Sequence, residues 1–195
     1  MIEKMDKKTS NTKAIFWDLQ GTLGGEATED IERFAPYSFA REALQTAKEN
    51  GFLNIIITNQ SLIGKGLLAR DVFIREANRI IDYFNEQGQL IDDFLYCPHK
   101  EEDNCDCKKP KTGLIQYCAE RYCLIISECY VIGDIGKNEI VMAKRAGCKG
   151  ILVMTGGGKG SLGEYRYTWN AYEADFIAND ALEAVKIVTR IACGS

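Results

Sequence analysis

The sequence predicts a doubly wound α/β domain with a mostly parallel sheet. Short apolar, β-branched stretches alternate along the chain with longer segments of helical periodicity, which is typical of strand-helix-strand units with right-handed crossovers. Three of the strand-like stretches end in a polar residue, at Asp18, Thr58 and Asp134. Ligands of doubly wound folds lie beyond the carboxyl ends of the strands. We therefore expect these three side chains on one functional edge of the sheet.

The strands are expected where short apolar runs meet turn residues. Residues 14–17 are too few for a helix and run into an acidic turn that contains Gly21, so they are expected to form a buried strand. Further strands are expected at 53–57, 93–96, 129–132, 150–154 and 175–178.

Helices are expected between these strands, where apolar residues recur at helical spacing. The expected helices occupy 38–50, 70–87, 110–122, 138–146 and 180–191. Ser38 and Asp180 are expected to cap the first and the last of them, and Pro110 to stand in the first turn of the third. The segments 24–37 and 155–172 lack a clear period and contain glycines, so both are expected to be loops.

Length and charge limit the possible architecture and partners. The chain has 195 residues, 46% of them hydrophobic, and we expect one domain over residues 13–192 after a frayed, charged lead-in at 1–12. The 24 basic and 28 acidic residues give a net charge of -4 without long runs, which argues against a nucleic-acid partner. No apolar run approaches the roughly 20 residues that span a bilayer. We therefore expect a cytoplasmic monomer without membrane contact.

Four separated pieces of the sequence match, in order, the four motifs of the haloacid dehalogenase superfamily, which the chain therefore resembles. They are the Asp18-x-x-Gly-Thr turn, Thr58 at a strand end, Lys109 before Pro110, and Asp134 after Gly133. The resemblance implies that Asp18 attacks phosphorus and forms an aspartyl phosphate, while Thr58 binds the phosphoryl oxygens. It implies that Lys109 neutralises the charge of Asp18 and of the phosphate. It also implies a catalytic Mg²⁺ bound by Asp18, the backbone carbonyl of Gln20, and Asp134.

A second group of residues has the composition of a metal site. Cys97, His99, Cys105 and Cys107 offer three thiolates and one imidazole, which is the ligand set of a closed, structural Zn²⁺ site. The loop 97–107 would then hold the two lysines that follow it over the active site. Two alternatives to a zinc site are open. One is a surface disulfide with His99 not involved, and the other is a catalytic Cys-His pair. The other thiols are expected to be core or surface residues: Cys118, Cys123, Cys129, Cys148 and Cys193.

These details narrow the resemblance to the D-glycero-D-manno-heptose-1,7-bisphosphate phosphatases, with the histidinol-phosphate phosphatases as near relatives that share the zinc loop. The residues that carry it are Thr58-Asn59-Gln60-Ser61, Gly64-Lys65-Gly66, the zinc loop with Lys108-Lys109-Pro110, Gly133-Asp134 and Thr155-Gly156. The likeness covers about residues 13–160 and implies an enzyme without a separate cap domain, acting on a small phosphorylated metabolite. It implies substrate or phosphate contacts by Asn59, Gln60, Lys65 and Lys108.

The sequence departs from the family pattern at the residue that handles protons. The family has a second Asp two residues after the nucleophile, whereas this chain has Gln20. An amide cannot exchange a proton near neutral pH, and acid-base catalysis is typically worth roughly 10² to 10⁴ in rate. The second acid expected four residues after Asp134 is Asn138, with Glu139 next to it as a partial substitute, and the usual basic residue after Asp134 is Ile135.

Three hypotheses follow from these departures. In the first, the chain is a Mg²⁺-dependent sugar-phosphate phosphatase that uses a water, a substrate group or Glu139 in place of the missing acid. In the second, it is a phosphate-ester binder with negligible turnover. In the third, it is a phosphotransferase that passes the phosphoryl group from Asp18 to a nucleophile other than water. Two interpretations are also open for the aromatic residues after the fifth strand, which are either a sugar-stacking wall or simple packing: Tyr165, Tyr167, Trp169 and Tyr172.

Overall fold

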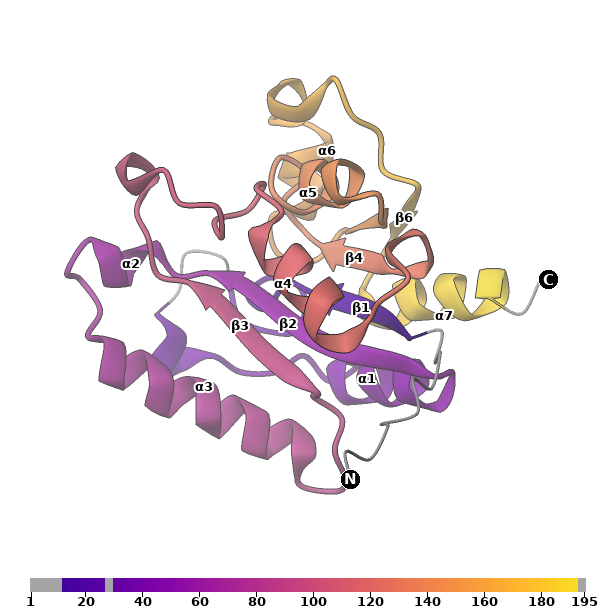
Figure 1. Cartoon of the computed structure of the whole chain (residues 1–195), viewed down its shortest axis with the longest axis horizontal. Helices are drawn as coiled ribbons and strands as arrows, with labels where there is room; N and C mark the ends of the chain where they lie inside the picture. Colours follow the sequence, from indigo (N-terminus) through magenta and orange to yellow (C-terminus); the bar gives the residue numbers. More distant parts are fainter. Residues whose placement is uncertain (1–11, 27–29, 193–195) are drawn as a thin grey trace, which may run out of the picture.

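The computed structural model describes residues 12–26 and 30–192, and within them six strands form one parallel sheet in the order β3-β2-β1-β4-β5-β6 (Figure 1). The strands are β1 (Lys13–Trp17), β2 (Phe52–Asn59), β3 (Asp93–Cys97), β4 (Tyr130–Gly133), β5 (Lys149–Val153) and β6 (Phe176–Ala178). The predicted lead-in lies outside the described residues except for Thr12. Cys193 also lies outside them.

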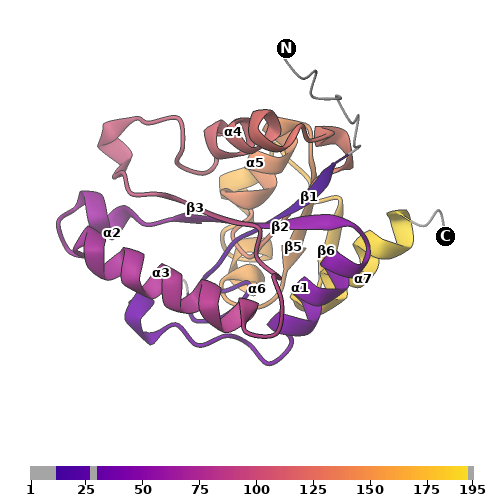
Figure 2. The ribbon, with the colours of Figure 1, turned by 60° about the horizontal axis from the view of Figure 1, so that its bottom comes forward.

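Helices cover both faces of the sheet, which confirms the doubly wound fold. Figure 2 shows α4 and α5 above the sheet and α1, α3 and α7 below it. The helices are α1 (Ala40–Glu49), α2 (Ser61–Gly64), α3 (Arg70–Asn85), α4 (Gly113–Tyr122), α5 (Glu139–Ala146), α6 (Gly158–Leu162) and α7 (Ala181–Ala192). No separate cap domain interrupts this arrangement in the described ranges. None of the helices described is long and apolar enough to cross a bilayer.

The central strand β1 explains why the core has two halves. Its side chains alternate between the faces, so that Ile15 and Trp17 pack with α1, α3 and α7, while Ala14 and Phe16 pack with α4 and α5. A strand that is buried on both faces has a continuous run of apolar residues, as β1 does. The next residue is Asp18, whose backbone N–H donates to the carbonyl of Ile132 in β4 (2.9 Å). The fold therefore brings Asp18 to the carboxyl edge of the sheet.

Two helix starts differ from the predictions. Helix α1 begins at Ala40, and no side chain caps it, so the predicted cap by Ser38 is wrong. Helix α4 begins at Gly113 instead of Pro110, because residues 108–111 form a turn closed by the hydrogen bond from Lys111 N to Lys108 O (2.8 Å). The predicted cap on α7 is confirmed, since Asp180 Oδ1 accepts from Glu183 N (2.9 Å).

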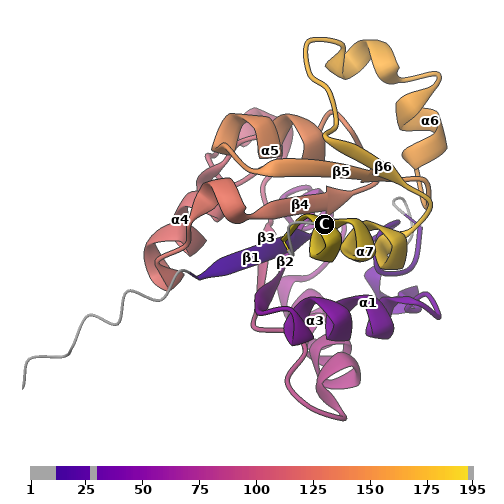
Figure 3. The same ribbon diagram turned by 90° about the vertical axis from the view of Figure 1, so that its right-hand side faces the viewer.

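The prediction of a loop over 155–172 is wrong in part. The segment contains α6 and a 3-10 helix at Arg166–Trp169, both of which project beyond β5 in Figure 3. Glycine disfavours helix locally, but the segment is shaped by packing: a Cβ at Gly158 would lie 1.8 Å from Val153 O. Short helices that the sequence did not suggest also occur elsewhere, at Ser61–Gly64, Ile31–Arg33, Glu101–Asp103 and Ile126–Glu128.

The aromatic residues of this segment divide between packing and exposure. Trp169 is buried, and its Nε1 donates to Ser161 O (3.0 Å). Its ring fills the space where Gly136 has no side chain, because a Cβ there would lie 2.2 Å from the indole. Tyr165 and Tyr167 are 51% and 71% exposed. The packing interpretation therefore holds for Trp169, while the two exposed tyrosines are free to face a ligand.

Candidate active site

The three strand-end residues meet in one pocket, as the strand pattern predicted. Asp18 follows β1, Thr58 lies near the end of β2, and Asp134 follows β4. They line a cavity of about 90 Å³. Asp18 retains access to solvent through its side chain, which is 11% exposed. The remaining lining residues are Gln20, Asn59, Lys109, Ile135, Asn138 and Glu139.

Lys109 is the positive charge of this pocket, and it is almost fully buried. Its Nζ makes ion pairs with Asp18 Oδ1 and with Glu139 Oε1 (2.7 Å for the second). Nζ also donates to the carbonyl of Ile57 in β2 (3.0 Å). Burial works to lower the pKa of Lys109, but the two carboxylates outweigh it and raise that pKa above its ordinary value. Lys109 therefore stays protonated beside Asp18.

Asn59 holds the backbone at Lys109. Its Oδ1 accepts from the Lys109 N–H (3.0 Å), and its Nδ2 donates to the Lys109 carbonyl (3.2 Å). The resemblance implied a substrate contact for Asn59, and the structure adds a contact that sequence reasoning missed. An asparagine at a strand end suits either role, because its amide can pair equally well with a ligand or with a peptide group.

Asp134 is fully buried, and one of its oxygens is unsatisfied. Oδ2 accepts from Gly157 N (2.7 Å), whereas Oδ1 has no hydrogen-bond partner within the described residues. Burial, together with the nearby carboxylates of Asp18 and Glu139, raises the pKa of Asp134 to about 8. A buried carboxylate oxygen without a donor is costly unless a cation compensates it.

Two glycines make room for the Asp134 carboxylate, which is a candidate ligand of such a cation. Gly21 has a φ of +85°, and a Cβ there would lie 2.3 Å from Asp134 Oδ2. Gly156 has a φ of +50°, and its Cβ would lie 2.4 Å from the same atom. The donor set of Asp18, Asp134 and the carbonyl of Gln20 consists of hard oxygens. The residues present therefore fit a divalent cation such as Mg²⁺.

Gln20 replaces the acid of the family pattern, and its amide is engaged on both sides. Its Oε1 accepts from Gln60 Nε2 (3.1 Å), and its Nε2 donates to the carbonyl of Glu26 (3.2 Å). Gln60 Nε2 also donates to Thr58 Oγ1 (3.1 Å). The two glutamines thus link the turn after β1 to the end of β2. A substrate contact by Gln60 stays a prediction.

Glu139 is the site residue whose position the sequence predicts least well. Its side chain is 1% exposed, and its second carboxylate oxygen accepts from Ile135 N (3.0 Å). Gly133 allows this approach, because a Cβ there would lie 2.1 Å from Glu139 Cγ. Asn138 also lines the pocket. The sequence places an acidic residue, Glu139, one position beyond the expected one. It gave no indication that this residue pairs with Lys109.

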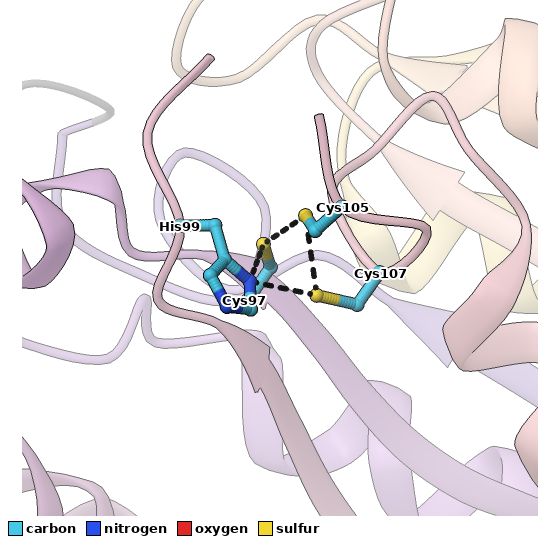
Figure 4. A group of neighbouring side chains, drawn as sticks. All are labelled: Cys97, His99, Cys105 and Cys107. Carbon is cyan, nitrogen blue, oxygen red and sulfur yellow. Dashed lines mark hydrogen bonds between the residues drawn. The ribbon is translucent and has the colours of Figure 1, made fainter. Parts of the chain in front are cut away.

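The four predicted metal ligands lie together at the end of β3 (Figure 4). Their ligand atoms all lie within 4.8 Å of one another. Sγ–Sγ distances are 3.5 Å for Cys97–Cys105 and 3.4 Å for Cys105–Cys107, and Cys107 Sγ lies 3.2 Å from His99 Nδ1. Ligands at zinc-like bond lengths on a tetrahedron lie about 3.3–3.8 Å apart. The cluster could therefore hold one metal ion.

The cysteines of this cluster are free thiols in the structure, and they perturb one another. Burial raises the pKa of Cys97 above its ordinary value. Burial acts in the same sense on Cys105, but hydrogen bonds from Cys107 and Cys97 overcome it and lower the pKa of Cys105 to about 7. Because thiolates are the metal-binding form, Cys105 is the ligand most easily ionised.

The metal loop is attached to α2. Gly64 N donates to Pro98 O (2.8 Å), and Lys108 Nζ contacts Ser61 Oγ and the carbonyl of His99 (3.3 Å for the second). Lys108 therefore lies at the junction of the loop and α2. Lys65, at the exposed end of α2, is not among the lining residues of the catalytic pocket. A substrate contact by Lys65 stays a prediction.

Known proteins are similar to this chain both in sequence and in fold. A family model described as HAD-like hydrolase matches residues 106–184. The probable D-glycero-D-manno-heptose-1,7-bisphosphate 7-phosphatase of Thermoplasma volcanium is 37% identical over 130 residues, which cover 66% of this chain and 88% of that protein. The chain belongs to the haloacid dehalogenase-like phosphatases. It is therefore a hydrolase of phosphoric monoesters.

Two further matches place this phosphatase within its family. The histidine biosynthesis bifunctional protein HisB of Blochmanniella floridana is 34% identical over 146 residues, and the match spans 72% of this chain but only 41% of that protein. The crystal structure of D,D-heptose 1,7-bisphosphate phosphatase from B. bronchiseptica, complexed with magnesium and phosphate, has a TM-score of 0.81 at 21% identity, covering 92% of this chain and 99% of that chain. This last likeness supports the fold.

Two clefts flank the catalytic pocket of this phosphatase. A cleft of about 470 Å³ lies between the 3-10 helix at Ile31–Arg33 and α2, and it reaches the pocket at Gln20 and Asn59. A smaller pocket of about 240 Å³ lies on the other side and shares Ile135 with the catalytic pocket. Either cleft is placed to receive the part of a substrate that extends from the phosphate.

Proposed function

We propose that this chain is a Mg²⁺-dependent phosphatase of a small sugar phosphate, of the heptose-bisphosphate type, and that it works through an aspartyl phosphate on Asp18. The observation that carries the proposal is the buried Lys109, paired with Asp18 in the same pocket as the unsatisfied oxygen of Asp134. The relatives named for heptose-bisphosphate phosphatase activity support the substrate class.

The residues of the pocket divide the work of phosphoryl transfer. Asp18 is the nucleophile, and the paired Lys109 orients its carboxylate and offsets the charge of the incoming phosphate. Thr58 and the backbone beside it donate to the phosphoryl oxygens. Asp18, Asp134 and the carbonyl of Gln20 would hold Mg²⁺, which supplies charge neutralisation when bound. Gln20 cannot supply the proton that the family's second Asp provides, so we expect slow turnover.

We further propose that the Cys97, His99, Cys105 and Cys107 cluster binds a structural Zn²⁺. Four protein ligands complete a tetrahedron and leave no position open for substrate. The loop leads directly to Lys108 and Lys109, so the ion would hold the catalytic lysine indirectly. Reduced thiols fit a reducing compartment such as the cytoplasm.

Two alternatives have a specific basis. The similarity to HisB favours a histidinol-phosphate phosphatase as the second candidate. The engaged amide of Gln20 favours a phosphate-ester binder or a phosphotransferase, because an aspartyl phosphate without a nearby base is long-lived.

A Mg²⁺-dependent assay on a panel of sugar phosphates, heptose bisphosphate and histidinol phosphate tests the proposal. We expect turnover of a sugar phosphate that Asp18→Asn abolishes. Preferred turnover of histidinol phosphate would favour the second candidate, and tight binding without turnover the pseudo-enzyme. A phosphoprotein that passes its phosphoryl group to an alcohol faster than to water would favour the phosphotransferase.

A further inference from the structure

The acids that line the catalytic pocket are all engaged in roles other than proton donation. Glu139 pairs one oxygen with Lys109 and accepts from Ile135 N with the other. Asp134 accepts from Gly157 N and has its second oxygen in the cation site. Asp18 is the nucleophile of the proposed function. Among the described lining residues, no carboxyl group is left to protonate a leaving oxygen.

Gln20 does not replace that proton donor. Its Nε2 is directed to the carbonyl of Glu26, and its Oε1 to Gln60. An amide N–H can stabilise a departing oxygen by hydrogen bonding, but it does not transfer its proton near neutral pH. A leaving group must therefore depart as an anion or collect its proton from water. The rate then depends on how basic that leaving oxygen is.

We propose, on the basis of the phosphatase function above, that this site turns over phosphate esters whose leaving oxygen departs readily without a proton, such as phenol-type (aryl) esters, faster than the alkyl esters of sugars. The pKa of a phenol is about 10, whereas an alkyl alcohol is about as weak an acid as water and has a much higher pKa. A departing phenolate is far more stable than a departing alkoxide. The missing proton donor therefore slows release of an alkyl group much more than release of an aryl group.

The two steps balance without a further co-reactant. A carboxylate oxygen of Asp18 forms a bond to phosphorus while the bond from phosphorus to the phenol oxygen breaks. Both electrons of that bond leave with the phenolate, which takes a proton from solvent. Water then attacks the phosphorus, the bond to Asp18 breaks to restore the carboxylate, and both protons of the water leave with the phosphate.

The pocket beside Ile135 suits an aromatic leaving group. Ile135 lines both this pocket and the catalytic pocket, so the two adjoin. The family pattern has a basic residue at this position, and the isoleucine removes that charge. The Ile135 side chain packs against the backbone of Gly157, since a Cβ there would lie 2.5 Å from Ile135 Cδ1. Tyr165 forms a further wall, with a half-exposed ring available for stacking.

Leaving-group dependence of kcat/KM tests the inference. The substrates are para-substituted phenyl phosphates of graded phenol pKa, together with glucose 6-phosphate as the alkyl ester, all with Mg²⁺. The variants are Gln20→Asp and the matched amide Gln20→Asn. We expect a steep fall of kcat/KM with leaving-group pKa in the natural protein and in Gln20→Asn. We expect Gln20→Asp to raise kcat/KM for glucose 6-phosphate at least about tenfold and for p-nitrophenyl phosphate less than about threefold.

A rapid-mixing experiment gives a second readout. With p-nitrophenyl phosphate, the natural protein should release a burst of nitrophenol equal to its active-site concentration, because Asp18 is phosphorylated faster than water can restore it. Gln20→Asp should reduce the burst. For the aromatic pocket, Tyr165→Ala should raise KM for phenyl phosphates but not for glucose 6-phosphate, whereas Tyr167→Ala should change neither.

Several results would overturn the inference. Equal leaving-group dependence in Gln20→Asp and Gln20→Asn would mean that another group supplies the proton. Turnover of glucose 6-phosphate as fast as that of p-nitrophenyl phosphate would contradict the selectivity while leaving the phosphatase function intact. Loss of all Mg²⁺-dependent turnover, with both ester classes, would instead contradict the proposed function on which the inference rests.

Discussion

Lys109 Nζ lies 2.7 Å from a carboxylate oxygen of Glu139, and both side chains are only 1% exposed. The same ammonium pairs with Asp18, so that one buried cation serves two carboxylates. Buried charges persist only where partners compensate them, and the removal of one partner is costly. The nucleophile of the proposed reaction is thus held by Lys109, whose ammonium Glu139 in turn holds in place.

We predict that Glu139→Gln weakens both stability and catalysis. The substitution removes a buried charge opposite Lys109, so it should lower the free energy of unfolding by about 3 kcal/mol. It should also lower kcat about 10²-fold, because a misplaced Lys109 no longer orients Asp18. Urea unfolding and steady-state kinetics measure the two effects. The exposed Glu128→Gln should change stability by less than about 0.5 kcal/mol. Equal behaviour of the two variants would contradict the assigned role of Glu139.

Gly21→Ala should weaken Mg²⁺ binding. The added Cβ would lie 2.3 Å from Asp134 Oδ2 at a backbone φ of +85°, so the carboxylate must move. We expect a higher Mg²⁺ concentration for half-maximal activity. Gly66→Ala is the matched control, because Gly66 has a φ of +68° but no atom within 4 Å of its Cβ position. If both variants shift the Mg²⁺ dependence alike, backbone strain alone is the cause.

Asn59→Ala should act on the position of Lys109. It removes two hydrogen bonds to the Lys109 backbone, so we expect a stability loss of about 1–3 kcal/mol together with a lower kcat. A rise in KM at unchanged stability would instead support the substrate contact implied by the family resemblance. Lys65→Ala, at an exposed site, should leave stability unchanged, and a rise in its KM would support the predicted substrate role of Lys65.

Elemental analysis should find one zinc per chain, and Cys105→Ser should lose it. Because the cluster holds the loop that precedes Lys109, we expect this variant to have a lower Tm and little activity. Cys123→Ser, at an exposed cysteine outside the cluster, is the control. After treatment with a chelator, added Zn²⁺ together with Mg²⁺ should restore activity. Full restoration by Mg²⁺ alone would argue against a structural zinc.

The edge-of-sheet part of the site could be predicted because strand geometry determines it. Residues that end neighbouring parallel strands must lie close together, which is why the alternation of strands and helices predicts Asp18, Thr58 and Asp134 at one edge of the sheet. The metal cluster was predictable from ligand chemistry and close spacing. Neither inference needed knowledge of how loops pack.

Loop packing is what the sequence did not reveal. The pairing of Glu139 with Lys109 depends on the approach of α5 to β4 across Gly133, a contact between side chains that no local pattern records. The amide of Asn59 is chemically suited to a ligand as well as to the backbone that it contacts. The helix α6 forms in a glycine-rich segment because tertiary contacts outweigh weak local propensity.

Two loops from separate parts of the chain converge on the carboxylate of Asp134. The turn after β1 contributes Gly21, the loop after β5 contributes Gly156 and the N–H of Gly157, and Thr155 Oγ1 ties the two loops by donating to Gly21 O (2.6 Å). An insertion on the β5 side would therefore disturb the cation site itself. Among the described residues, the cleft toward α2 shares Gln20 and Asn59 alone with the catalytic pocket. Substrate preference is accordingly easier to re-engineer from the α2 side, where new side chains can be introduced without moving the carboxylate of Asp134.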